Sequence, residues 1–120
     1  MPSLIKEKRR RRIGAMRKTS VLQMSINDIL NTVCLIQGVS RLDARSKSRG
    51  AELVKARAIF AYISRKRGLS TIAIGEAINR NHASICHHYN KYSELLDKTK
   101  PWYDAELDNE VQKISMIINS

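Results

Sequence analysis

Apolar residues recur at helical spacing through most of the chain beyond residue 25, and turn-forming residues separate the runs. The first run follows Ser25, which together with Asp28 three positions later resembles a capping box, and Gly38 ends it. Its apolar positions are Ile26, Ile29, Leu30, Val33, Leu35 and Ile36. This pattern predicts an amphipathic helix between the serine and the glycine.

A longer apolar run follows a short basic connection. Residues 41–49 are rich in arginine and serine, with room for one helical turn around Leu42. Gly50 then precedes a helix predicted over residues 51–67, which Gly68 stops. The broad apolar face of this helix comprises Leu53, Val54, Ala58, Ile59, Ala61, Tyr62 and Ile63.

A short helix and a polar turn come next. Ser70 is a suitable N-cap for a helix in which Ile72, Ile74 and Ala77 are expected to be buried. Gly75 in that helix permits close approach of a neighbouring segment. The polar turn after it is made by Asn79, Arg80 and Asn81.

Two further helices are predicted over residues 82–97 and 102–118, with a break at residues 98–101. The apolar stripe of the earlier helix is Ile85, Tyr89, Tyr92 and Leu96. The stripe of the last helix is Leu107, Val111, Ile114 and Ile117. Because no segment is rich in β-forming residues, the chain is predicted to be an all-α bundle of five or six helices.

The charge of the chain indicates the kind of partner. The sequence has 22 Lys and Arg against 11 Asp and Glu, a formal net charge of +11, so a polyanion is expected. Residues 1–20 are strongly basic with little apolar periodicity, and we interpret them as a flexible arm. The arm is either a solvated tail that adds nonspecific affinity or a phosphate-contacting or targeting segment. Residues 21–120 are predicted to form one domain.

The cellular compartment is indicated by the cysteines and by the hydropathy. Two cysteines, Cys34 and Cys86, are too few for a secreted disulfide framework and favour a reducing cytoplasm. No apolar run approaches the length of a membrane span, and the basic start lacks the apolar region of a signal peptide. We therefore expect a soluble, cytoplasmic protein that does not contact membranes.

The two helices on either side of the polar turn have the layout of a DNA-reading helix-turn-helix. In that motif the first residues of the second helix enter the major groove. Small side chains at Ala83 and Ser84 permit close approach to base edges, and His82 can bond a base or a phosphate. The outward positions of the helix are Ala83, Ser84, His87, Asn90 and Lys91. Arg80 and Asn81 suit phosphate contact or capping, and Asn81 is a natural N-cap.

The same residues carry a family resemblance. Residues 69–88 read LSTIAIGEAINRNHASICHH, which resembles the Ile-Gly-x-x-Phe-Gly-Gly-Arg-Asp-His motif of the bacterial chromosomal replication initiator DnaA. Upstream, residues 48–63 are similar to the basic loop and the following helix of that family. Residues 26–118 therefore resemble the C-terminal DNA-binding domain of DnaA, which implies a Trp-repressor-like, all-α helix-turn-helix fold.

The resemblance implies roles for matching positions. A basic-loop arginine enters the minor groove in the family, and Arg49 occupies that place, with Lys47 close by. The helix arginine that touches DNA corresponds to Arg57. The motif histidine and the two hydroxyl residues that read bases correspond to His82, Ala83 and Ser84. The complete set of predicted DNA-binding residues is Lys47, Arg49, Arg57, Arg80, Asn81, His82, Ala83, Ser84, His87 and Lys91.

The chain departs from the family motif at several positions. Asn81 replaces the motif aspartate, Ala83 replaces the first hydroxyl residue, and Ala58 replaces a glutamine. The Gly-Gly turn is shortened to Asn79. Since these positions help to read the sequence, the identity of the bound site is left open.

Enzymatic chemistry is not expected from these 120 residues. The ATPase module of the family needs a phosphate-binding loop, and glycines at only 14, 38, 50, 68 and 75 do not supply its spacing. No catalytic residue and no cofactor are predicted. The chain resembles a stand-alone DNA-reading domain, as expected for a phage, a mobile element or an accessory role in replication or transcription.

Metal and catalytic alternatives are weaker interpretations. His82 and Cys86 share a helical face, but no second ligand pair with zinc spacing follows, so no metal is predicted. The acidic residues of the last helix suit a helix N-terminus better than a nuclease site. Aromatic residues, including Trp102, are expected in the core, and Cys86 is expected to be a small buried residue.

The sequence favours sequence-specific binding of double-stranded DNA, in replication initiation or its regulation. Replication or phage proteins are candidate partners, and a monomer is expected. One alternative is a DNA-recognition subunit of a packaging or transposition complex. Another is a non-enzymatic structural or adaptor protein, and a stable oligomer would favour either alternative.

Overall fold

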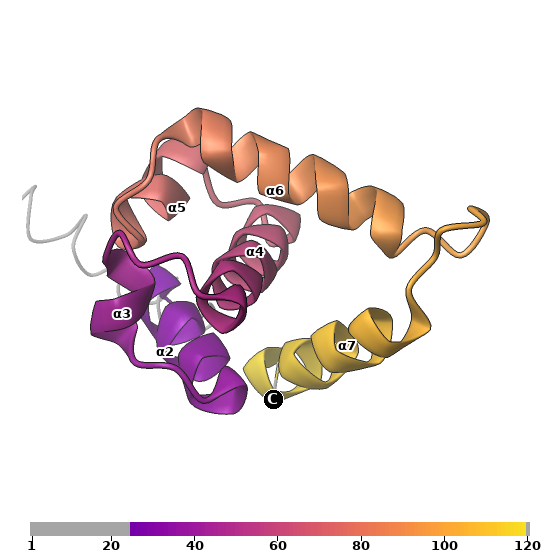
Figure 1. Ribbon diagram of the computed structural model, residues 1–120, viewed down its shortest axis with the longest axis horizontal. Coiled ribbons are helices and arrows are strands. Elements are labelled where there is room, and N and C mark those ends of the chain that lie inside the picture. The colour runs from indigo at the N-terminus through magenta and orange to yellow at the C-terminus, as the bar shows by residue number, and fades with distance from the viewer. Residues whose placement is uncertain (1–24, 120) are drawn as a thin grey trace, which may run out of the picture.

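The structure is a computed structural model that describes residues 25–119, which form six helices and no strand (Figure 1). The helices are α2 (Ile26–Gln37), α3 (Arg41–Arg45), α4 (Ala51–Lys66), α5 (Thr71–Ala77), α6 (His82–Leu95) and α7 (Ala105–Asn119). The predicted all-α class is therefore confirmed. The predicted arm, residues 1–20, and residues 21–24 of the predicted domain lie outside the described residues.

Side-chain caps set where most of the helices begin. Each capping residue has an extended backbone, and its side-chain oxygen accepts a hydrogen bond from the backbone N–H three residues later. The capping residues are Ser25, Ser40, Ser70 and Asn81. At the end of α2, Gly38 adopts the left-handed conformation with φ 73° and closes the helix. The predicted start of α2 after Ser25 and its predicted end at Gly38 are thus confirmed by specific hydrogen bonds.

The central helix is α4, which packs against each of the other five helices. In Figure 1 it lies between α6 on one side and α2 and α7 on the other. Consecutive residues such as Ile59, Phe60 and Ala61 are fully buried, because neighbours cover the helix on nearly every side. Burial of a side chain as large as Phe60 or Ile59 stabilises the fold by about 1.5–3 kcal/mol.

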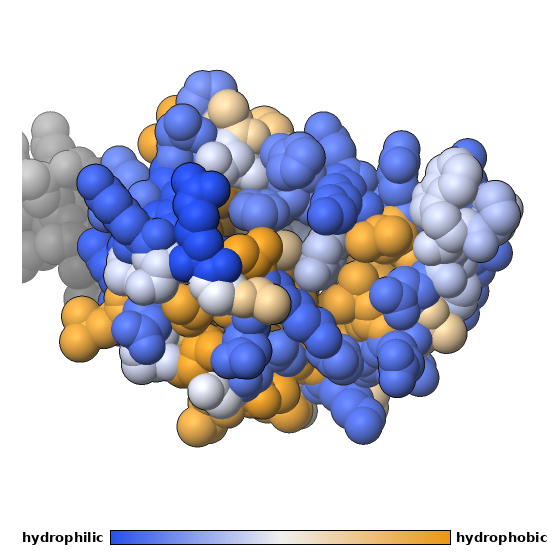
Figure 2. Space-filling model, viewed as in Figure 1, coloured by the Kyte–Doolittle hydropathy of each residue, from blue (hydrophilic) through white to orange (hydrophobic). Residues whose placement is uncertain are grey.

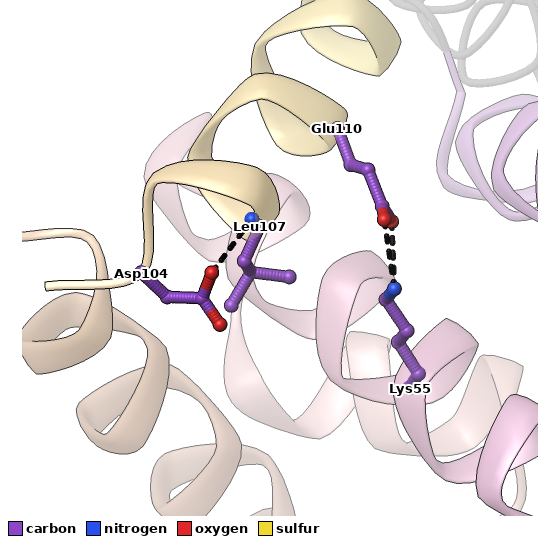
Figure 3. Close-up of polar contacts among 4 residues, drawn as sticks. All are labelled: Lys55, Asp104, Leu107 and Glu110. Atoms are coloured by element: carbon purple, nitrogen blue, oxygen red, sulfur yellow. Dashed lines mark hydrogen bonds and ion pairs between the residues drawn. The ribbon is translucent and has the colours of Figure 1, made fainter.

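The last helix begins later than predicted. The carboxylate of Asp104 accepts the N–H of Leu107 at 3.0 Å, so that α7 starts at Ala105 rather than at residue 102 (Figure 3). Trp102 lies in the turn before this cap and is 50% exposed, so its predicted place in the core is wrong. Likewise α6 ends at Leu95, because residues 96–104 form turns.

An ion pair joins α7 to α4. The Nζ of Lys55 lies 2.8 Å from a carboxylate oxygen of Glu110 (Figure 3). Both side chains are 40% exposed, so the pair contributes at most about 1 kcal/mol. The apolar stripe of α7, with Val111 and Ile114 fully buried, holds the helix more firmly against the bundle.

Several apolar residues expected to face the core are exposed. Helical geometry gives the reason: in α7 the buried stripe continues at 4-3-4 spacing through Ile118, so Ile117 turns outward. Ile72 lies two residues, more than half a turn, before the buried Ile74. The residues wrongly expected on core faces are Leu35, Ile36, Val54, Ile72 and Ile117.

None of the helices in residues 25–119 combines the length and the apolar character that crossing a bilayer requires.

Candidate nucleic-acid interface

The turn between α5 and α6 is fixed by two residues with unusual backbone requirements. A Cβ added at Gly75 would lie 2.3 Å from the carbonyl oxygen of Arg80, so only glycine permits this approach. The N–H of Arg80 in turn donates to the carbonyl of Gly75 at 2.8 Å. Asn79 has φ 57°, a left-handed conformation that asparagine tolerates better than most residues. These contacts confirm the close approach predicted at Gly75.

The N-terminus of α6 is capped and exposed. The side-chain oxygen of Asn81 accepts the N–H of Ser84 at 2.9 Å, which confirms the predicted cap. Ile85 is fully buried and anchors the helix, whereas His82 and Ala83 are exposed and Ser84 is partly buried. The first turn of α6 therefore presents short side chains and a helix N-terminus, which favours negative charge. His87 and Lys91, also predicted to face outward, are exposed.

Cys86 is also exposed on α6, contrary to its expected burial. It directly follows the buried Ile85, and one residue along a helix is a rotation of about 100°. In contrast, Cys34 is buried in α2, and burial raises the pKa of its thiol.

Arg57 links α4 to the end of α3 and to the first residue of the connection that follows α3. Its Nε donates to the carbonyl of Ala44 at 2.8 Å, and its Nη2 donates to the carbonyls of Asp43 and Ser46, each at 3.0 Å. The side chain is only 3% exposed. The guanidinium thus binds the chain's own backbone, a structural role that the resemblance to the helix arginine of the family did not imply.

Arg80 and Arg45 join the same connection to the helix-turn-helix. The Nη2 of Arg80 donates to the carbonyl of Ser46 at 2.8 Å, and Nη1 of Arg45 donates to the carbonyl of Ala77 at 3.1 Å. Lys47 and Arg49, on the connection itself, are exposed. Hydrogen bonds from Arg57 and Arg80 therefore hold the backbone at Ser46, while the side chains of Lys47 and Arg49 after it are exposed.

These elements enclose a groove beside the start of α6. Its lining residues are Lys47, Arg49, Val54, Arg57, Asn79, Arg80, Asn81, Ser84 and His88. Four of them are lysine or arginine and none is acidic. Figure 2 shows strongly hydrophilic side chains beside the connection between α3 and α4 on this face. A concave surface with cations from three segments and no carboxylate is complementary to a polyanion such as a nucleic-acid backbone.

Burial and neighbouring cations lower the pKa of two titratable groups of the groove. Burial, followed by the charges of Arg80 and Arg49, lowers the pKa of Arg57, although its guanidinium stays charged at all ordinary pH values. Burial also lowers the pKa of His88, with smaller contributions from neighbouring cations. A bound anion would offset the part of each shift that comes from the neighbouring cations.

The groove brings together six of the ten predicted residues: Lys47, Arg49, Arg57, Arg80, Asn81 and Ser84. The remaining four, His82, Ala83, His87 and Lys91, lie on the exposed side of α6 beside it. The groove residues that sequence reasoning did not assign to the site are Val54, Asn79 and His88. The position of His88, four residues after Ser84 on one helix, was the signal that could have identified it.

Across residues 25–119, no three His, Cys, Asp or Glu side chains are grouped as metal ligands. The described lining of the groove consists of basic and polar residues together with the apolar Val54. Basic and polar side chains of this kind bind and orient an anionic ligand.

Comparison with known proteins adds to this geometry. Residues 26–91 match the family described as bacterial dnaA protein helix-turn-helix, a segment that contains both the basic connection and the turn. The chain is also 31% identical over 81 residues to the chromosomal replication initiator protein DnaA of Pseudothermotoga lettingae. That alignment covers 67% of this chain and 18% of the length of the relative.

Proposed function

Because this chain belongs to the bacterial DnaA helix-turn-helix family of DNA-binding domains, we propose that it binds double-stranded DNA in a sequence-specific manner. The proposed role is in replication initiation or its regulation, including that of a phage or mobile element. The observation that carries the proposal is the groove, in which four cations and no carboxylate adjoin the capped start of α6. We further propose that the chain contributes recognition and no catalysis.

The proposed contacts divide into two kinds. Lys47 and Arg49 would contact phosphates or the minor groove, because they are exposed and follow the backbone held at Ser46. His82, Ala83 and Ser84 would face base edges in the major groove, because they occupy the first turn of α6. The first kind supplies affinity for any duplex, and the second distinguishes between sequences.

The proposal is tested by removing equal charge at two places. One variant combines Lys47→Ala with Arg49→Ala, and the control combines Lys98→Ala with Lys100→Ala in the exposed turn between α6 and α7. If the groove binds DNA, the first variant loses affinity and its log K against log salt slope becomes shallower by about 1–2. The control should keep nearly the slope of the unchanged protein.

Equal losses in the two variants would show that net charge, rather than this groove, governs binding. A protein that binds no duplex at low salt would contradict the proposed function itself. Because all four substituted side chains are exposed, neither variant should lose more than about 0.5 kcal/mol of stability.

A further inference from the structure

His88 lines the groove but is not among the ten DNA-binding residues predicted from the sequence. It lies four residues after Ser84 on α6, so the two side chains occupy one groove-facing stripe of the helix. Together they place a hydroxyl group and a titratable imidazole on the wall of the groove.

Cations face His88 from each element that borders the groove. Arg57 comes from α4, Arg80 from the turn before α6, and Lys47 and Arg49 from the connection between α3 and α4. On α6 itself the charged or titratable neighbours are His87 and Lys91. Among residues 25–119, none that lines the groove carries a carboxylate. The imidazole is therefore in surroundings that favour its neutral form as long as no anion is bound.

The titration of His88 agrees with this arrangement. Burial is the main cause that lowers the pKa of its imidazole, and His87, Lys91, Arg57 and Arg80 lower it further. At neutral pH the neutral form of the His88 side chain therefore predominates in the free protein. A phosphate group placed among these residues would supply the missing negative charge and favour the imidazolium form.

We propose that His88 is a further DNA-contacting residue, which takes up one proton from the solvent when a backbone phosphate occupies the groove. This inference rests on the proposed function, since it assigns one more residue to the same interface. The imidazolium would donate a charge-assisted hydrogen bond to the phosphate. The proton makes the affinity for DNA depend on pH.

The direction of that dependence follows from linkage. The pKa of His88 lies below its ordinary value in the free protein and rises in the complex, so the complex binds more protons than the separate partners. Affinity therefore increases as the pH falls, and the gain disappears as the pH rises through the pKa of the complex. For one proton the gain is at most about tenfold per pH unit.

The test compares His88→Gln in the full chain with Lys98→Gln, a substitution of an exposed side chain in the turn between α6 and α7, outside the groove. Affinity for a mixed-sequence duplex is measured at fixed ionic strength between about pH 5.5 and pH 8. Glutamine keeps a polar side chain but does not titrate. We expect His88→Gln to flatten the pH dependence and Lys98→Gln to retain it.

A second measurement needs no substitution. Imidazole resonances of the unchanged chain are titrated by NMR with and without the duplex, and the pKa of His88 should rise on binding. An unchanged pKa, or full pH dependence in His88→Gln, would overturn the inference. Binding that does not vary with pH overturns the role of His88 alone, whereas absence of duplex binding at every pH also overturns the proposed function.

Discussion

Arg57 and Arg80 donate hydrogen bonds to the same backbone oxygen, the carbonyl of Ser46, at 3.0 and 2.8 Å. One arginine comes from the central helix α4 and the other from the turn before α6. The shared acceptor joins the basic connection to both elements at once. Arg57 and Arg80 therefore position the connection, whereas the exposed side chains of Lys47 and Arg49 are accessible to a ligand.

Substitution of Arg57 should destabilise the fold as well as weaken DNA binding. Arg57→Ala removes three hydrogen bonds and leaves the carbonyl of Ala44 without its donor, whereas the carbonyls of Asp43 and Ser46 keep other donors. We therefore expect the free energy of unfolding to fall by about 1–3 kcal/mol. Urea denaturation measures this change. The control Arg49→Ala removes an exposed side chain and should cost at most about 0.5 kcal/mol. Unchanged stability in Arg57→Ala would contradict its assigned structural role.

Gly75→Ala should disrupt the turn of the helix-turn-helix. The added Cβ would meet the carbonyl oxygen of Arg80, and neither backbone segment can move freely, so a loss of about 1–3 kcal/mol is expected. Gly50→Ala is a matched control, because a Cβ there meets no atom within 4 Å. Thermal unfolding of the two variants gives the comparison. Similar melting temperatures would mean that the close approach at residue 75 is not required.

Two substitutions at Asn81 distinguish the need for a capping oxygen from the need for the amide group. Asn81→Ala removes the acceptor of the Ser84 N–H and should destabilise the protein by about 1 kcal/mol. Asn81→Asp retains an acceptor of the same shape, so its stability should remain within about 0.5 kcal/mol of the unchanged protein. Chemical denaturation distinguishes the two. Equal losses would show that the amide itself, rather than the cap, is needed.

The two cysteines should differ strongly in their reaction with thiol reagents. Cys86 is exposed, whereas Cys34 is buried in α2. Burial raises the pKa of Cys34, so at neutral pH even less of the reactive thiolate is present. Under native conditions we expect one fast-reacting thiol, identified as Cys86 by mass spectrometry of the labelled peptide. Rapid modification of Cys34 would contradict the packing of α2.

Local signals explain how much of the fold could be predicted. Ser25, Ser70 and Asn81 act as caps through hydrogen bonds that span three residues, so the sequence alone identifies them. Gly75 is similar, because its close neighbour lies only five residues away. The apolar faces were less certain: positions such as Leu35 and Ile117 adjoin a buried stripe, and only packing determines which residues turn inward.

The site is held together by contacts between residues far apart in the sequence, which a local sequence pattern does not reveal. Arg57 reaches carbonyls 11 to 14 residues earlier in the chain, and Arg80 reaches Ser46 across 34 residues. Family resemblance assigned Arg57 to DNA, but the structure also gives its guanidinium three internal acceptors. The spacing of four residues indicates that His88 shares a face of α6 with Ser84, but the groove beside that face also needs residues of the connection and of α4, which are distant in the sequence.

Selection of bound duplexes from a randomised library at near-physiological salt tests the central claim most directly. We expect one short motif to be enriched, and we expect Ser84→Ala to lose about 1–3 kcal/mol of discrimination at a single base pair of that motif. Arg49→Ala serves as the comparison, since loss of a phosphate or minor-groove contact should weaken binding more uniformly. Retention of duplexes with no enriched sequence would contradict sequence-specific recognition and leave a nonspecific basic domain.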